Sequence, residues 1–282
     1  MQESDFLPLI DLALLEDLGN LGDVTSKAIT PDEQRTACLW SKDEGVLAGE
    51  AVFTSVFKRV DPRVKVEFHF HDGAVLAKGD KAATVRGRAQ SLFSAERTAI
   101  NYIGLLSGIA TKSRRFASLA AAHGKAVILD TRKTIPGLRA LSKYAVTVGG
   151  SRNHRQGLYD MALIKDNHID SAGSITAAIE GVRRMWRGRF SIEVECRTLG
   201  EVEEAVKAGA DIVMLDNMSA AECAKSAGLV AGKAKTEASG NMAEEKIREY
   251  AEAGVDFISV GALTHTVACF DFSLKVERGG AA

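Results

Sequence analysis

The residues most able to do chemistry are concentrated in one strongly basic segment. Between Arg132 and Lys165, seven Lys or Arg accompany a single acid, which gives the segment a charge of +6 in a chain of net charge −1. The seven are Arg132, Lys133, Arg139, Lys143, Arg152, Arg155 and Lys165, and the acid is Asp160. Arg presents a rigid fork suited to carboxylate or phosphate, so this local excess predicts an anionic ligand.

The surroundings of these cations differ. Arg132, Lys133 and Lys165 directly follow short apolar runs typical of buried strands, so we expect their charges to lie in a cleft. Arg139 and Lys143 have the i,i+4 spacing of neighbours on a helix, and we expect them on a solvated helix face.

A glycine-punctuated loop at 149–155 adds His154 and Arg155 to the basic segment. The neighbouring guanidinium disfavours protonation of His154 unless a ligand anion compensates, so we expect both residues to bind that anion. His69 and His71 alternate with apolar residues on a predicted strand, which indicates its outer face rather than a metal site.

Two acids, Glu195 and Asp216, end neighbouring predicted strands and should lie on the rim of the same cleft. Carboxylates beside a phosphate-bearing ligand hold Mg²⁺ or sugar hydroxyls, since Mg²⁺ takes one or two carboxylates plus substrate oxygens. They could instead balance Arg132 and Lys165 as ion pairs. Glu193, two residues before Glu195, should share its face, so either could meet the ligand.

Ser239, Gly240 and Gly261 follow the last two predicted strands, and a helical pattern at 242–253 comes after the first of these turns. Backbone N–H groups at such helix starts bind anions, and in barrels phosphate often sits at the last strand-end loops. Together with the nearby cations, these turns predict a phosphate site.

Six short apolar runs alternate with amphipathic helical stretches in the second half of the chain, as in a parallel α/β barrel. The runs are 126–129, 161–164, 192–194, 212–215, 235–238 and 257–260. A full eightfold barrel usually takes about 250 residues, so we expect a reduced barrel with its site at the carboxyl ends of the strands.

The first half mixes helices with short strands and reads as α+β. Helical spacing runs to Gly19 and recurs from 91 to 107, while strict alternation at 64–70 predicts a strand. A last alternation at 270–276 predicts a strand that returns to this N-terminal domain.

Composition excludes several classes of protein. With 282 residues, 46% of them hydrophobic and 26% charged, the chain is no disulfide miniprotein, coiled coil or disordered tail. Its near-neutral charge gives no global case for nucleic acid or membrane, and no apolar run approaches a membrane span. Four scattered cysteines without a CxxC pair and an acidic N-terminus lead us to expect reduced thiols and a cytoplasmic protein.

Several short motifs occur in a fixed order along the chain, and together they are specific enough to indicate a protein family. They are Gly22-Asp23-Val24-Thr25, Glu96-Arg97-Thr98, Leu106-Ser107-Gly108, Asp130-Thr131-Arg132-Lys133-Thr134, Asn153-His154-Arg155, Ile164-Lys165-Asp166-Asn167-His168, Glu193-Val194-Glu195, Leu215-Asp216-Asn217, Glu237-Ala238-Ser239-Gly240 and Gly261-Ala262-Leu263-Thr264-His265. Over nearly its whole length the chain resembles the quinolinate phosphoribosyltransferases, also called nicotinate-nucleotide pyrophosphorylases (carboxylating).

The resemblance implies a transferase that joins quinolinate to phosphoribosyl pyrophosphate with Mg²⁺, giving nicotinate mononucleotide, CO2 and pyrophosphate in NAD biosynthesis. It implies an N-terminal α/β sandwich at 1–111, to which a strand at about 269–278 returns, and a reduced α/β barrel at 112–268. It also implies a homodimer or a hexamer of dimers, in which Arg97 is donated across the interface to the partner's site.

By position, the resemblance assigns quinolinate to one set of residues and phosphoribosyl pyrophosphate to another. The quinolinate set is Arg97, Arg132, His154, Arg155 and Lys165. The second set is Lys133 for pyrophosphate, Glu195 and Asp216 for ribose and metal, and Ser239, Gly240 and Gly261 for the 5′-phosphate. Lys165, Glu195 and Asp216 are the expected catalytic residues. The chain departs from the family at Asn241, where a second glycine is common, although Asn tolerates positive φ.

Three other functions compete with this one. A paralogue of the same fold, from a molybdate operon or acting on another pyridine carboxylate, would leave an Arg unpaired in a buried pocket. An aldolase-like barrel would use Lys165 as a Schiff-base lysine, which borohydride trapping would reveal. A nucleic-acid patch would need aromatic residues among the cations, and the basic segment has few.

Overall fold

The structure, a computed structural model, describes residues 2–277 and divides them into two compact units. The described part of the first unit comprises 2–114, 136–150 and 266–277, and the second comprises 115–135 and 151–265. Residues 136–150, which lie inside the predicted barrel domain, belong to the first unit.

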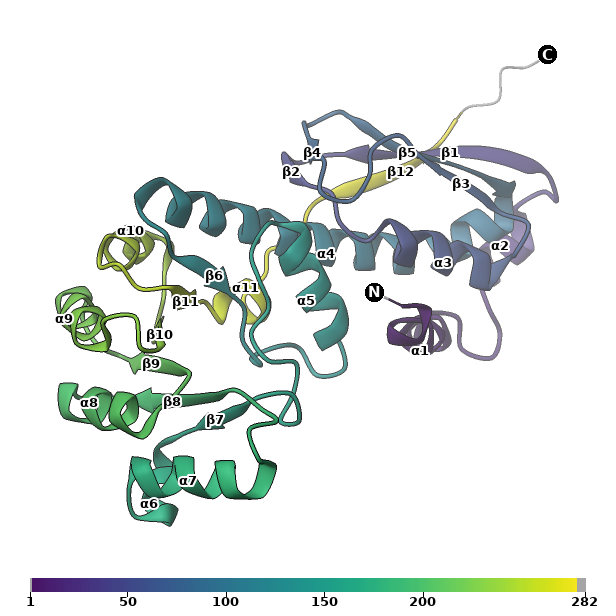
Figure 1. The fold of residues 1–282 in the computed structure, drawn as a ribbon. Coiled ribbons are helices and arrows are strands. Elements are labelled where there is room, and N and C mark those ends of the chain that lie inside the picture. The colour runs from purple at the N-terminus through teal and green to yellow at the C-terminus, as the bar shows by residue number, and fades with distance from the viewer. Residues whose placement is uncertain (1, 278–282) are drawn as a thin grey trace. The chain divides into compact units, whose positions relative to one another are not determined.

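The first unit is built on a four-stranded antiparallel sheet in the order β12-β1-β5-β3 (Figure 1). The strands are β1 (Gln34–Ser41), β3 (Lys65–Phe68), β5 (Lys81–Arg88) and β12 (Phe272–Val276), and β2 (Gly45–Val46) pairs separately with β4 (Val75–Leu76). The last strand of the chain pairs with β1, from Ala37 opposite Val276 to Ser41 opposite Phe272. The C-terminal alternation therefore does form a strand of this sheet.

Helices cover one face of this sheet (Figure 1). They are α1 (Leu7–Leu18), α2 (Val24–Ile29), α3 (Glu50–Val60) and the start of α4 (Ala89–His123), with α5 (Arg139–Val148) in the same unit and a short 3-10 turn, η1 (Glu3–Asp5), before α1. Helix α3 buries Val52, Phe53, Val56 and Phe57 at helical spacing, which explains its amphipathic sequence.

Helix α4 is much longer than the predicted helix at 91–107, because its glycines do not end it. Gly108, just past the predicted end, lies against the carbonyl of Ala268, and a side chain at Gly104 would be 2.9 Å from the carbonyl oxygen of Phe270, so these glycines let a later segment pass close to the helix. In α5 the expectation of a solvated face is wrong for Lys143, whose side chain is buried along with Leu141 and Ala145.

The second unit contains a six-stranded parallel sheet in the order β6-β11-β10-β9-β8-β7. The strands are β6 (Val127–Leu129), β7 (Ala162–Ile164), β8 (Ile192–Cys196), β9 (Ile212–Asp216), β10 (Lys235–Ser239) and β11 (Phe257–Ser259). The reduced α/β barrel is thus confirmed, and each predicted run coincides with one strand to within two residues at either end.

Helices connect these strands along one side of the sheet, as Figure 1 shows for α7 to α10. They are α6 (Asp166–Ala172), α7 (Ile175–Trp186), α8 (Leu199–Ala208), α9 (Ala220–Val230) and α10 (Glu244–Glu252), and α11 (Ala262–His265) follows β11, the last strand of this sheet along the chain. Side chains of Ser174, Thr198 and Ser219 accept backbone N–H bonds at the starts of α7, α8 and α9, which fixes where these helices begin.

A further segment lies beside β6, the strand at one end of the described sheet. The Arg152 N–H donates to the Ile128 carbonyl at 2.9 Å, and the Asp130 N–H donates to the Arg152 carbonyl at 3.1 Å. This bridge fixes the loop that carries His154 and Arg155 against the strand that precedes Arg132.

Among residues 2–277, the structure contains no helix long and apolar enough to cross a membrane.

Candidate active site

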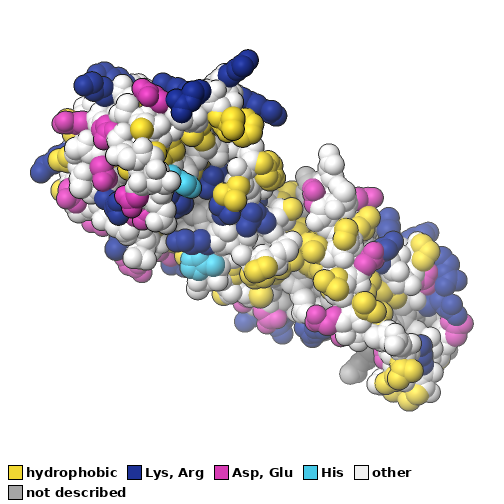
Figure 2. Space-filling view, turned by 90° about the horizontal axis from the view of Figure 1, so that it is seen from below, with side chains coloured by type: hydrophobic (Ala, Val, Ile, Leu, Met, Phe, Trp, Pro, Cys, Tyr) yellow, Lys and Arg dark blue, Asp and Glu magenta, His cyan; other side chains and the backbone are white. Residues whose placement is uncertain are grey.

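A cavity of about 220 Å³ in the second unit is lined by residues from the ends of all six strands and the loops that follow them. We call it the basic cavity, and its lining is Thr131, Arg132, Lys133, His154, Arg155, Leu163, Lys165, Glu195, Met214, Asp216, Ser239 and Ser259. Figure 2 shows Lys and Arg side chains gathered around a hollow in this unit. Eight of the predicted site residues therefore lie around one space.

Two guanidiniums of the basic cavity, one buried and one half-buried, lie close enough to repel each other. Arg155 is only 9% exposed and donates from Nη1 to the Met161 carbonyl at 3.2 Å. Burial and the positive charge of Arg132 both lower the pKa of Arg155. The Nε of Arg132 is buried, and no described residue accepts its proton. Two neighbouring guanidiniums, one buried and the other half-buried with a free donor, indicate a site for an anion with more than one negative oxygen.

Lys165 and Glu195 form the ion pair of the basic cavity, with Nζ 2.7 Å from Oε2. The Lys165 side chain is about half exposed at the start of α6, whereas Glu195 is mostly buried in β8. Of the two glutamates left open by the sequence, Glu195 lines the cavity and Glu193 is fully buried.

Asp216 stands at the end of β9, next to β8 in the sheet, and shares the cavity with Glu195. Burial and the negative charge of Glu195 raise the pKa of Asp216, while a 2.8 Å bond donated by Asn217 Nδ2 opposes this. Two acids that repel each other at the edge of a cationic pocket fit a divalent cation or a developing positive charge.

The turns predicted to hold phosphate are built at the ends of β10 and β11. Ser239 lines the basic cavity, but Gly240 and Gly261 are not part of its lining. Gly240 has φ +110°, and Asn241 has φ +44°, the left-handed conformation that Asn tolerates. Gly261 lies against Lys133, because a side chain at this glycine would be 3.1 Å from Lys133 Cδ.

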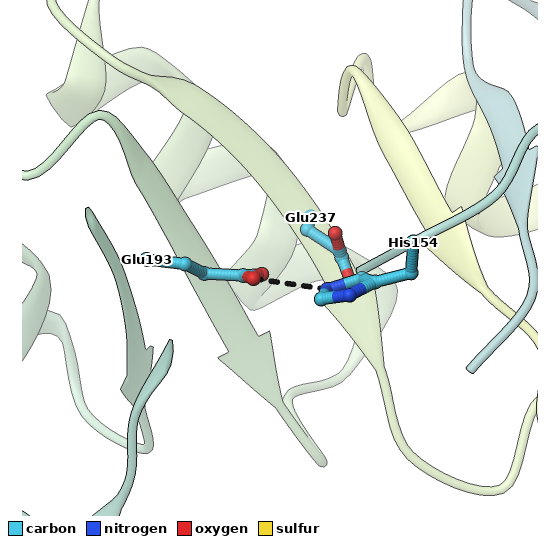
Figure 3. A group of neighbouring side chains, drawn as sticks. All are labelled: His154, Glu193 and Glu237. Atoms are coloured by element: carbon cyan, nitrogen blue, oxygen red, sulfur yellow. Dashed lines mark ion pairs between the residues drawn. The ribbon is translucent and has the colours of Figure 1, made fainter. Parts of the chain in front are cut away.

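His154 lies over two fully buried glutamates that converge on its ring from β8 and β10 (Figure 3). Its Nε2 is 2.9 Å from Glu193 Oε2 and 3.5 Å from Glu237 Oε1. On the other side of the ring, Nδ1 accepts the backbone N–H of Arg155 at 2.7 Å. Ser259 Oγ donates to Glu237 Oε1. Both ring nitrogens thus face protein groups and not the open cavity.

Comparison with known proteins identifies the two halves of the chain. Residues 23–107 match the model of the quinolinate phosphoribosyl transferase N-terminal domain, and residues 109–275 match that of the C-terminal domain. The chain belongs to the quinolinate phosphoribosyltransferase family.

Individual relatives of the quinolinate phosphoribosyltransferase family agree along the whole chain. It is 41% identical over 292 residues to quinolinate phosphoribosyltransferase [decarboxylating] 1b of Nicotiana tabacum, covering 97% of this chain and 83% of that one. It is 42% identical over 268 residues to a probable nicotinate-nucleotide pyrophosphorylase [carboxylating] of Bacillus subtilis, covering 95% and 92%. The solved nicotinate-nucleotide pyrophosphorylase of Francisella tularensis superimposes with a TM-score of 0.95 at 37% identity, covering 98% of both chains.

Arg97 is the one predicted quinolinate residue that lies in the first unit. It is exposed on α4 and lines a separate pocket of that unit together with Glu16, Asp17 and Tyr102. The residues that line the basic cavity all belong to the second unit, so Arg97 is not among them.

Sequence reasoning assigned no role to Glu237 or Ser259. Glu237 is an acid inside an otherwise buried strand, and its burial pattern in β10 places it with Ala238 in the interior. An acid within a central buried strand is a signal in itself, because a buried carboxyl requires a partner. Ser259 gave no such signal, since serine is common at strand ends.

Proposed function

We propose that this protein transfers the phosphoribosyl group of phosphoribosyl pyrophosphate to quinolinate, releasing pyrophosphate and CO2 and forming nicotinate mononucleotide for NAD biosynthesis. The observation that carries the proposal is the pair of Arg132 and Arg155 in one cavity with the acids Glu195 and Asp216. A planar dicarboxylate next to a sugar carbon that becomes positive in the transition state needs these two kinds of charge side by side.

In this proposal Arg132, Arg155 and Lys165 neutralise the two carboxylates of quinolinate, with His154 completing the wall of the pocket. The guanidinium forks fix the plane of the ring and so hold its nitrogen against the sugar carbon. Arg155 is held by the Met161 carbonyl and costs little further ordering when the ligand binds.

Glu195 and Asp216 face the ribose and stabilise the positive charge that grows on its carbon as pyrophosphate leaves. Carboxylate oxygens are what Mg²⁺ prefers, and the raised pKa of Asp216 marks an excess of negative charge that a cation would relieve, so these two residues fit Mg²⁺. When bound, Mg²⁺ would neutralise charge on the leaving pyrophosphate.

Lys133 binds the departing pyrophosphate, and the turns at Ser239, Gly240 and Gly261 bind the 5′-phosphate. The Lys133 carbonyl accepts a 2.8 Å bond from Thr264 Oγ1, which ties the lysine to α11, the short helix that begins directly after Gly261. The backbone of these turns offers N–H donors without a side chain in the way.

Decarboxylation follows alkylation of the ring nitrogen. The carbon–carbon bond to the carboxylate next to the nitrogen breaks, CO2 leaves, and the electron pair remains on the ring carbon, where the cationic nitrogen stabilises it until a proton is added. The protein needs only to keep the ring in place during this step.

The working form in this proposal is a homodimer or a hexamer of dimers, in which Arg97 of one protomer completes the basic cavity of its partner. Large apolar side chains near the N-terminus of the first unit are exposed, among them Leu12, Leu15 and Leu21, as expected for a contact surface. We propose the cytoplasm as its compartment, because all four cysteines are free thiols.

The test mixes the purified protein with Mg²⁺, phosphoribosyl pyrophosphate and either quinolinate or nicotinate, and measures nicotinate mononucleotide by chromatography along with released CO2. Product and CO2 from quinolinate alone are expected. Turnover of nicotinate and not of quinolinate, by a folded protein, would overturn the assignment and favour a monocarboxylate-specific paralogue.

A further inference from the structure

Two carboxyl groups with no exposed surface lie inside the sheet of the second unit, and the chemistry proposed above does not use them. We call Glu193 and Glu237 the carboxyl pair. A ligand atom from each and one from His154 lie within 4.8 Å of one another (Figure 3). Both carboxyl oxygens of Glu193 and Oε2 of Glu237 have no hydrogen-bonding partner among the described residues.

The carboxyl pair must share a proton, because two buried carboxylates this close cannot both be ionised. Burial and the negative charge of Glu193 raise the pKa of Glu237 well above its ordinary value, so Glu237 is the protonated member. Its Oε1 already accepts from Ser259 Oγ, so its proton belongs on Oε2, the oxygen of Glu237 that has no other partner among the described residues. This proton is then available to the neighbouring carboxylate of Glu193.

The state of His154 follows from its neighbours. Because Nδ1 accepts the Arg155 N–H at 2.7 Å, Nδ1 carries no proton, and the ring proton is on Nε2. This proton lies beside the Glu193 carboxyl, because Nε2 is 2.9 Å from Glu193 Oε2. The backbone N–H of His154 donates to Asp130 Oδ1 at 2.9 Å, so main chain and ring are both held.

The same donors and acceptors argue against a metal ion at this cluster. A metal would need the lone pair of Nε2, but Nδ1 already uses its own lone pair for the Arg155 N–H, so the ring would have to give up its last proton.

We propose that Glu193 and Glu237 are positioning residues for the basic cavity, holding His154 as the neutral Nε2–H tautomer and, through its Nδ1, fixing the main chain of Arg155. The positive charge offered to the substrate then comes from the arginines and Lys165, and His154 contributes a neutral wall. This role in substrate binding rests on the proposed function, whereas the tautomer of His154 follows from its contacts with Arg155 and Glu193 alone.

The first test needs no activity. Long-range ¹H–¹⁵N spectra of the full-length protein labelled at histidine report the tautomer of each ring, and a His154→Gln variant identifies the signals of His154 among the six histidines. A neutral ring protonated on Nε2 at pH 7, unchanged when stoichiometric Zn²⁺ is added, is expected. A ring protonated on Nδ1, an imidazolium, or a shift caused by Zn²⁺ would overturn the proposal, whatever the protein catalyses.

The second test separates positioning from simple stability. Glu237→Leu removes the proton donor to Glu193 and should raise KM for quinolinate about tenfold, the effect of losing one buried hydrogen bond. Glu237→Gln keeps a donor toward Glu193 and an acceptor for Ser259, so it should recover most of that loss. KM for phosphoribosyl pyrophosphate should change less than twofold in both.

The matched control is Glu203→Leu, which removes an exposed carboxyl from α8. Glu203→Leu should leave both KM values as they are. If Glu237→Gln is as impaired as Glu237→Leu, or if both substrates lose affinity equally, the positioning role is wrong. If Glu237→Leu does not fold, the tautomer measurement on the unaltered protein still decides.

Discussion

Replacing Arg132 with Met should abolish most activity without weakening the fold. We expect the guanidinium to gain an acceptor for its buried Nε only when substrate is bound, so its removal affects catalysis and not folding. The Arg132 Nε is buried without an acceptor, and its charge lowers the pKa of the neighbouring Arg155. In the free protein this guanidinium therefore has a buried donor without a partner among the described residues and opposes the charge of Arg155. In the complex, we propose that it meets a substrate carboxylate in a site largely closed to water.

The size of the activity loss follows from breaking a buried charge pair. Removing one partner of such a pair costs about 2–5 kcal/mol, which corresponds to a loss of about 30-fold to several thousand-fold in kcat/KM for quinolinate. The free energy of unfolding should stay within about 0.5 kcal/mol of the original value or rise, because the like charge that opposes the buried Arg155 disappears.

The assay combines steady-state kinetics with thermal and urea unfolding of Arg132→Met and of a control, Arg184→Met, which removes an exposed guanidinium from α7. The control should change neither property. If Arg132→Met loses activity and stability together, with a drop of 2 kcal/mol or more in unfolding free energy, Arg132 is a structural residue and the reasoning fails.

Three further predictions concern other parts of the molecule. Asp61 is held by Arg63, which lowers the pKa of this carboxyl, so its stabilising effect is present above the unfolded pKa and is lost as pH falls. Asp61→Asn should therefore cost about 1 kcal/mol in urea unfolding at pH 7 and progressively less below about pH 4, and a constant difference would contradict this. Gly240→Ala should destabilise the protein by about 1–3 kcal/mol and raise KM for phosphoribosyl pyrophosphate. Gly240 has φ +110°, which alanine rarely adopts, and the added methyl group would collide with Asn217. Unchanged unfolding and kinetics would refute this prediction. A thiol reagent should modify one cysteine of the native protein rapidly, the exposed Cys269, and all four after denaturation, whereas rapid modification of more than one native thiol would show that the other three are not protected.

The fold was largely predictable because its strands are short, apolar and separated by amphipathic helices. The apolar part of each of the six barrel strands is followed by a polar residue or a glycine, for example Arg132 after β6 and Asp216 at the end of β9. Helix α4 was underestimated because Gly108, directly after the predicted helix, is a residue that often follows a helix end, whereas here it lies inside the helix and allows close packing against the Ala268 carbonyl. Such contacts between distant segments leave no local signal.

The sequence was enough to predict most of the residues that line the site, but not the contacts that these residues make with one another. Alternation in β8 put Glu193 and Glu195 on one face, and only the structure separates the buried acid from the one that lines the cavity. The burial of Lys143 was missed because i,i+4 spacing fixes which residues are neighbours on a helix, not which face is covered. The hydrogen bonds of His154 depend on three separate segments of chain, and no spacing rule encodes them.

The segment at Arg152 that bridges to β6 should also protect the protein from aggregation. By pairing with Ile128 and Asp130, residue Arg152 covers backbone groups at an end of the sheet that could otherwise pair with another chain. The same few residues carry His154 and Arg155 into the basic cavity. A substitution that loosens this loop should therefore expose unpaired backbone groups of β6 and also displace His154 and Arg155 from the basic cavity. Aggregation and loss of activity should then appear in the same variants.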